Sequence, residues 1–92
     1  MKERNTFGDF VWERQDFEDD LGEIETKRIR CEEWYFMGEC KKGTQIFHGK
    51  GILIVYDEDN LYIYEGYFVD DKRHGKSRQI NSDGEAFWGR YD

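Results

Sequence analysis

Apolar and polar positions alternate in the C-terminal part of the chain as they do in half-buried strands. Residues 64–68 read Tyr-Glu-Gly-Tyr-Phe, an aromatic-x-Gly-x-aromatic pattern, and the polar residues Asp-Asp-Lys-Arg follow at 70–73. His-Gly-Lys at 74–76 then opens a second stretch, which Ser-Asp-Gly at 82–84 ends. A strand, a polar turn and a second strand closed by a turn signal predict a β-hairpin.

The same pattern recurs along the chain. Residues 47–57 read FHGKGILIVYD and residues 73–83 read RHGKSRQINSD, so the two segments superpose with an offset of 26 residues. A further aromatic-x-Gly unit, FWGRY at 87–91, starts 23 residues after Tyr64. A hairpin of this size cannot bury its own apolar face, whereas stacked copies can. We therefore expect an all-β, single-layer array of antiparallel β-hairpins.

Tyr-x-Gly-x-Phe, His-Gly-Lys-Gly and Asp-Gly in this order resemble the MORN (membrane occupation and recognition nexus) repeat. The resemblance covers residues 36–92 and implies copies at 36–63 and 64–86 and a partial copy at 87–92. The positions that match the repeat are Phe36, Gly38, Gly43, His48, Gly49, Gly51, Tyr64, Gly66, Phe68, His74, Gly75, Asp83, Gly84, Phe87, Gly89 and Tyr91.

Three positions depart from the repeat, and its glycines are expected to serve the backbone. Ser77, Gln79 and Cys40 stand where a glycine, an apolar residue and an aromatic residue are usual. Glycine lets a strand bend with positive φ or lets two strands approach without a Cβ between them. The expected structural glycines are Gly38, Gly49, Gly51, Gly66, Gly75, Gly84 and Gly89.

Residues 1–35 carry a weaker signal. Residues 21–35 fit the second strand of a degenerate half-repeat, with Gly22 in the place of the His-Gly glycine, although their alternation is imperfect. Residues 1–20 are expected to form an N-terminal arm or cap. Residues 7–20 fit a capping strand, a short helix or an arm that folds only on a partner, with three aromatic anchors: Phe10, Trp12 and Phe17.

Composition predicts a thin, aromatic core and argues against two classes of partner. The chain has 92 residues, 17% of them aromatic, and each buried aromatic side chain removes roughly 150–250 Å² from water. Such a core is marginal for a domain that stands alone. The net charge of −7 argues against nucleic acids and anionic lipid surfaces, which select basic faces.

The two cysteines and the absence of a long apolar run bear on localisation. Cys31 and Cys40 cannot build a disulfide framework and fit a reducing compartment. No apolar run approaches the roughly 18 residues of a membrane span. We expect an intracellular protein, cytoplasmic or cytoskeletal, with membrane or organelle association as a further option.

No segment has the spacing of a catalytic, metal or cofactor site. His48 and His74 stand at the same position of successive repeats, which favours packing against a neighbouring aromatic ring over catalysis. The two cysteines are too far apart for a short zinc-knuckle spacing. His-Gly-Lys-Gly at 48–51 runs into a predicted strand, whereas a phosphate loop runs into a helix. We therefore expect a protein that is not an enzyme and that needs no cofactor.

The expected function is non-catalytic protein binding, as an adaptor or structural subunit of a larger assembly. An aromatic stripe on one face of a single-layer sheet, together with an open sheet edge, suits contact with another protein. The resemblance to MORN repeats implies a groove that holds a helix or an extended peptide of a partner. The candidate contact residues are Tyr64, Phe68, Phe87, Trp88 and Tyr91.

Two alternatives remain. The chain can be a membrane- or phosphoinositide-associated module, as the family's name implies for some members, or a regulatory piece of an enzyme complex. Acidic Asp70, Asp71 and Asp83 flank the basic cluster that would contact lipid headgroups, which weakens the lipid interpretation. The candidate lipid-binding residues are Lys72, Arg73, Lys76 and Arg78.

Overall fold

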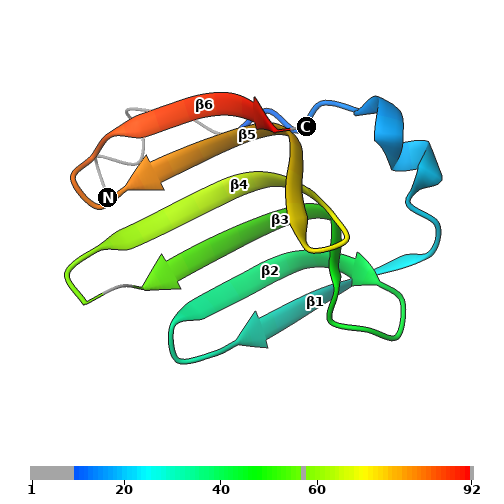
Figure 1. The fold of residues 1–92 in the computed structure, drawn as a ribbon, viewed down its shortest axis with the longest axis horizontal. Coiled ribbons are helices and arrows are strands. Elements are labelled where there is room, and N and C mark those ends of the chain that lie inside the picture. The colour runs from blue at the N-terminus through cyan, green and yellow to red at the C-terminus, as the bar shows by residue number, and fades with distance from the viewer. Residues whose placement is uncertain (1–9, 57, 92) are drawn as a thin grey trace.

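The computed structural model describes residues 10–56 and 58–91, which form one open antiparallel sheet of six strands (Figure 1). Each strand pairs with the strands that precede and follow it in the chain, so the sheet is a meander. These residues contain almost no helix, and the prediction of an all-β fold with a single sheet is confirmed. The strands are β1 (Ile24–Arg30), β2 (Trp34–Lys41), β3 (Phe47–Tyr56), β4 (Leu61–Val69), β5 (Lys72–Asn81) and β6 (Ala86–Tyr91).

Small residues line up across the sheet. Gly38 of β2 faces Gly51 of β3, which in turn faces Gly66 of β4. Ser77 of β5 faces both Gly66 and Gly89 of β6. The aromatic-x-Gly units found in the sequence therefore lie in one register in β2, β4 and β6.

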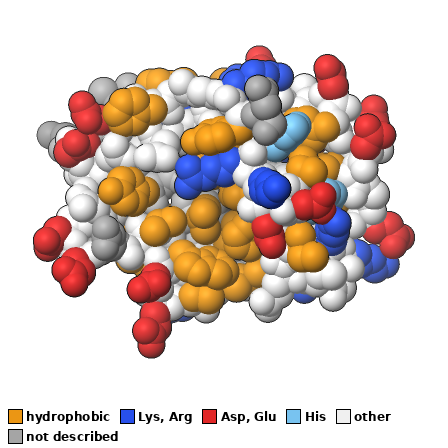
Figure 2. Space-filling view, in the orientation of Figure 1, with side chains coloured by type: hydrophobic (Ala, Val, Ile, Leu, Met, Phe, Trp, Pro, Cys, Tyr) orange, Lys and Arg blue, Asp and Glu red, His pale blue; other side chains and the backbone are white. Residues whose placement is uncertain are grey.

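Aromatic rings fill the space above the inner part of this row. A Cβ on Gly51 would lie 2.5 Å from the ring of Phe36, so the ring occupies the volume that a side chain would need. Phe36 stacks on Phe47 with ring centroids 3.8 Å apart, and Phe68 meets both rings edge-on. We call this side of the sheet the aromatic face, and Figure 2 shows hydrophobic side chains gathered at its centre. Its buried core cluster consists of Phe36, Cys40, Tyr64 and Phe68.

Both His-Gly-Lys segments form a β-bulge. The pairing register shifts after Gly38 between β2 and β3, and after Gly66 between β4 and β5. The bulged segments contain Gly49 with φ 119° and Gly75 with φ 76°, a backbone conformation that glycine adopts without strain. The repeat in the sequence is therefore accompanied by a repeat in backbone geometry.

Residues 10–21, here called the arm, cover the opposite side of the sheet. In Figure 1 the start of this segment, in blue, passes behind β5 and β6. The rings of Trp12 and Phe17 meet Tyr67 edge-on, with centroids 5.6 and 5.7 Å apart, and Phe17 also meets His74 at 4.5 Å. Because Tyr67 neighbours a residue of the core cluster in β4, it points away from the aromatic face. We call this second side the arm face.

Residues 10–33 form one short helix and one strand. The arm contains a short 3-10 helix, η1 (Asp16–Asp20), which agrees with one of the three forms considered for this segment. β1 lies within the segment 21–35 and pairs with β2, but Gly22 precedes the strand and takes no part in the pairing. The part of the expected arm at 1–9 lies outside the described residues.

Candidate protein-contact surface

The outermost strand β6 exposes three large aromatic side chains, which we call the edge surface. Phe87 is 53% exposed, Trp88 58% and Tyr91 39%. Phe36 and Tyr64, which occupy the place of Phe87 in their own repeats, are exposed by no more than 1%. The difference has a structural cause, because β3 and β5 cover these inner rings and the described residues contain no strand beyond β6.

A hollow of about 400 Å³ lies beside the edge surface. Gly89 lines this hollow, and a Cβ built on it meets no atom within 4 Å. A Cβ on the equivalent Gly38 would lie 2.9 Å from the ring of Phe36, and one on Gly66 would lie 2.6 Å from the hydroxyl of Tyr64. The hydroxyl of Ser77 donates to the carbonyl of Gly89 at 3.4 Å. The hollow is therefore the uncovered counterpart of sites that aromatic rings fill in the inner strands. It is lined by Ser77, Gln79, Phe87, Trp88, Gly89, Arg90 and Tyr91.

Arg73 holds Tyr91 in place at the border of this surface. Its guanidinium lies 4.4 Å from the ring centroid of Tyr64 and 5.8 Å from that of Tyr91. The same group donates to the Tyr91 hydroxyl at 3.3 Å. Arg73 stands where Phe47 stands one repeat earlier, so a cation–π contact replaces a ring stack.

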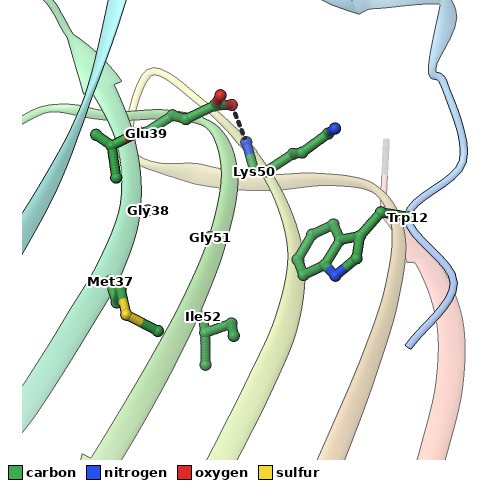
Figure 3. Close-up of a pocket in the computed structure, with 8 residues that line it drawn as sticks. Trp12, Met37, Gly38, Glu39, Lys50, Gly51 and Ile52 are labelled. Carbon is green, nitrogen blue, oxygen red and sulfur yellow. Dashed lines mark hydrogen bonds between the residues drawn. The ribbon is translucent and has the colours of Figure 1, made fainter. Parts of the chain in front are cut away.

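A second, smaller hollow of about 220 Å³ lies on the arm face, shown in Figure 3. The ring of Trp12 borders it on one side, and Met37 and Ile52 border it on the other. Glu39 accepts a hydrogen bond from the backbone N–H of Lys50 at 2.7 Å and thereby holds the first bulge. The carboxylate in this hollow therefore serves the backbone.

The two histidines have different surroundings. His48 is buried, its Nδ1 accepts from the backbone N–H of Asp70 at 3.0 Å, and its Nε2 donates to the carbonyl of Leu21 at 3.0 Å. Both ring nitrogens thus bind backbone groups. His74 instead packs edge-on against Phe17 of the arm. The expected contact with an aromatic ring is seen for His74, and the ring belongs to the arm rather than to a neighbouring repeat.

The cysteines lie at opposite ends of β2. Cys31 is exposed next to the start of this strand, and Cys40 is buried in the core cluster at its end. Burial raises the pKa of the Cys40 thiol above its usual value. Within residues 10–56 and 58–91, no group of three or more His, Cys, Asp and Glu side chains is placed to hold a metal ion.

The four candidate lipid-binding residues do not form one patch. Arg73 lies over rings of the aromatic face, and the ammonium of Lys76 pairs with Glu13 of the arm at 3.0 Å. Arg78 is buried, with only 3% of its surface exposed. The structure therefore distributes the basic residues of β5 over both faces of the sheet.

The role of Arg78 was missed in the sequence. Its guanidinium pairs with Glu65 at 2.7 Å and lies 5.9 Å from the ring centroids of Phe10 and Trp88. Glu65 and Arg78 face each other in β4 and β5. The predicted hairpin register could have indicated the ion pair, but not the ring contributed by the arm.

The candidate contact residues in β4 and in β6 differ in accessibility. Tyr64 and Phe68 are buried in the core cluster, so their rings are used within the chain. Phe87, Trp88 and Tyr91 are accessible. Of the five residues proposed for protein contact, only these three lie on the surface.

Comparison with protein-family models, with curated proteins and with solved structures yields no match. In the part of the chain that the structure describes, no helix has the length and apolar character needed to cross a membrane.

Proposed function

We propose that this chain is a non-catalytic protein-binding module, an adaptor or structural subunit, that contacts its partner through the edge surface. One observation carries the proposal. The same repeat position is occupied by a buried ring in β2 and β4 and by the half-exposed ring of Phe87 in β6. Large aromatic side chains are costly to leave in water and are enriched in the centres of protein interfaces.

The resemblance of residues 36–92 to MORN repeats supports the same function. Arrays of that kind hold a helix or an extended peptide of another protein. The hollow beside β6 combines rings with hydrogen-bonding groups of Ser77 and Gln79, a combination that suits a peptide.

Phosphoinositide binding has weaker support. Arg78 is buried against Glu65, and Lys76 is paired with Glu13, so two of the four basic candidates are already engaged within the chain. A headgroup site needs several cations on one surface, since each contributes about 1 kcal/mol.

The proposal is tested by comparing two double variants. Phe87→Ala with Trp88→Ala removes two rings of the edge surface. Tyr56→Ala with Leu61→Ala removes two exposed apolar side chains that face each other in β3 and β4, away from that surface. Affinity capture from a native extract, with quantitative mass spectrometry, is carried out for both variants and for the unchanged chain.

We expect the first variant to lose the proteins that the unchanged chain recovers, and the second to keep them. Both variants should show cooperative unfolding, because the removed side chains lie outside the core cluster. Equal recovery by the two variants would contradict the proposal.

A further inference from the structure

The two outer edges of the sheet correspond to the two halves of one hairpin. β6 carries the aromatic-x-Gly pattern of the first strands β2 and β4. β1 corresponds to the second strand of a hairpin. Lys27 of β1 faces Gly38 of β2, just as Gly51 of the second strand β3 faces Gly66 of β4. Among the described residues, β6 has no second strand beside it and β1 has no first strand.

On both edge strands, every second residue directs its backbone N–H and carbonyl away from the sheet, and the outward-directed positions of the two strands correspond. The N–H of Asn81 donates to the carbonyl of Glu85 at 2.8 Å, so Trp88 and Arg90 direct their backbone groups away from β5. The N–H of Cys31 donates to the carbonyl of Trp34 at 2.8 Å, so Arg28 directs its backbone groups away from β2.

The pairing inside the two complete hairpins, β2–β3 and β4–β5, shows which residues of β6 and β1 would face each other. Met37 faces Ile52 in β2 and β3, and Glu65 faces Arg78 in β4 and β5. Trp88 occupies the place of Met37 and Glu65 in its strand, and Arg28 occupies the place of Ile52 and Arg78. The outward-directed residues of the two edges are thus those that pair inside the existing hairpins.

From this correspondence we infer that β6 of one copy of the chain pairs antiparallel with β1 of a second copy, which completes the hairpin and joins the copies head to tail. In this register Trp88 faces Arg28 of the second copy, and Phe87 faces Ile29 of the second copy. The inference names a partner for the edge surface of the proposed function.

The side chains that meet have complementary chemistry. Arg28 is exposed and presents a cation to the Trp88 ring, which already has the Arg78 guanidinium 5.9 Å from its centroid on the inner side. Ile29 brings an apolar side chain to the half-exposed ring of Phe87. The contact therefore covers two of the three exposed rings of the edge surface, those of Phe87 and Trp88.

Lys27 is a charged residue on the edge strand β1, and charged residues on an edge strand usually oppose pairing. It would face Gly89, and a Cβ built on that glycine meets no atom within 4 Å. Its ammonium already donates to the carbonyl of Thr44 at 2.7 Å and is thereby drawn toward the β2–β3 connection. The aliphatic part of Lys27 can therefore lie above the glycine with its charge satisfied.

The size and symmetry of the contact predict weak, progressive association. One added strand buries less than the roughly 1,200–2,000 Å² of a stable interface. A head-to-tail contact leaves a free edge on each end of a dimer, so further copies can add. The average mass should therefore rise steadily with concentration.

Two edge-blocking variants test the inference. Trp88→Pro removes an outward N–H from β6, and Arg28→Pro removes one from β1, while the pairing with β5 and β2 uses other residues. Average mass is measured by sedimentation velocity over a hundredfold range of concentration for the 92-residue chain, for each variant alone and for their equimolar mixture. Circular dichroism verifies folding. If a proline variant does not fold, Trp88→Lys or Thr26→Pro takes its place.

We expect the unchanged chain to associate with rising concentration and each variant alone to remain monomeric. The mixture should form dimers and no larger species, because each variant keeps one intact edge. A monomeric unchanged chain, continued association of either variant alone, or a monomeric mixture would each overturn the inference. A monomeric chain that still captures other proteins through Phe87 and Trp88 would overturn self-association and leave the proposed function standing.

Discussion

Gly75 is the residue at which the backbone of the sheet and the arm meet. Its φ of 76° is in the left-handed region, and a Cβ there would lie 2.9 Å from the ring of Phe17 and 3.1 Å from Oε1 of Gln15. Both the bulge and the packing of the arm therefore depend on the missing side chain. Gly89 differs from it in both respects, because its φ is not positive and a Cβ there meets no atom within 4 Å.

We expect Gly75→Ala to lower the free energy of unfolding by about 1–3 kcal/mol, because it combines backbone strain with a clash. Gly89→Ala is the matched control and should change it by less than about 0.5 kcal/mol. Urea unfolding of both variants measures the difference. Equal stability of the two variants would show that position 75 is an ordinary strand position.

Two buried tyrosines predict how stability depends on pH. Burial raises the pKa of Tyr64 and of Tyr67 to about 12, against 10.0 for an ordinary tyrosine. Below pH 10 both groups are protonated in the folded and the unfolded chain. Between pH 10 and 12 the unfolded chain loses these protons first, so the stability associated with the neutral hydroxyls is lost as the pH rises.

The melting temperature should therefore fall between about pH 10 and 12, and it should fall less steeply in the variant with Tyr64→Phe and Tyr67→Phe. Tyr56→Phe, at an exposed position, serves as the control and should follow the unchanged chain. Differential scanning calorimetry at several pH values gives the slopes. Parallel curves for the unchanged chain and the double variant would contradict the assignment to these hydroxyls.

At the scale of elements, the turn between β4 and β5 connects more than its own two strands. Asp70 and Asp71 have φ values of 52° and 69°, the backbone of a two-residue type I′ hairpin turn. The backbone N–H of Asp71 donates to the carbonyl of Phe47 at 2.9 Å, and its carboxylate accepts from the N–H of Phe47 at 2.7 Å. The turn thus fastens the β4–β5 hairpin to the beginning of β3.

Asp71→Ala should lower the free energy of unfolding by about 1–2 kcal/mol, because it removes this acceptor and places alanine at positive φ. Asp71→Asn keeps an oxygen acceptor and a residue that tolerates the left-handed conformation, so we expect it to stay close to the unchanged chain. Chemical unfolding of the two variants measures both changes in the free energy of unfolding. A loss in Asp71→Asn as large as that in Asp71→Ala would show that charge, not hydrogen bonding, matters here.

At the scale of the whole molecule, the arm supplies the second layer that a single sheet lacks. Its contacts are spread over β3, β4 and β5. Leu21 accepts from His48, Glu13 pairs with Lys76, and Phe17 packs on Tyr67. A thin core of this kind draws a large share of its stability from such a cover.

We expect Phe17→Ala to destabilise the fold by about 1–3 kcal/mol, since the ring also packs on His74 and over Gly75. Arg14→Ala, at an exposed position of the same arm, is the control. Thermal unfolding measures stability, and binding of a hydrophobic dye reports exposure of the arm face. Unchanged unfolding and dye binding in Phe17→Ala would mean that the arm does not stabilise the sheet.

The sequence alone determined the local structure. Alternation of aromatic and small residues in 64–68 and 87–91 was enough to predict strands, and Asp-Gly at 83–84 was enough to predict a turn. The turn expected over residues 70–73 is shorter in the structure, because Lys72 and Arg73 already pair with β4 as the first residues of β5. These signals act over two to five neighbouring residues, so they do not depend on the rest of the chain. The repeated His-Gly-Lys likewise indicated a repeated backbone feature, seen as two bulges with left-handed glycines.

Only the tertiary structure decided which side chains remain accessible. Tyr64 and Phe87 share one repeat position, yet one is buried and the other is half exposed, because burial depends on whether a further strand lies alongside. The face covered by the arm and the enclosure of Arg78 between Phe10 and Trp88 likewise depend on contacts between residues far apart in the chain. Periodicity indicates to which face of the sheet a side chain points, and it carries no information about which segment packs against that face.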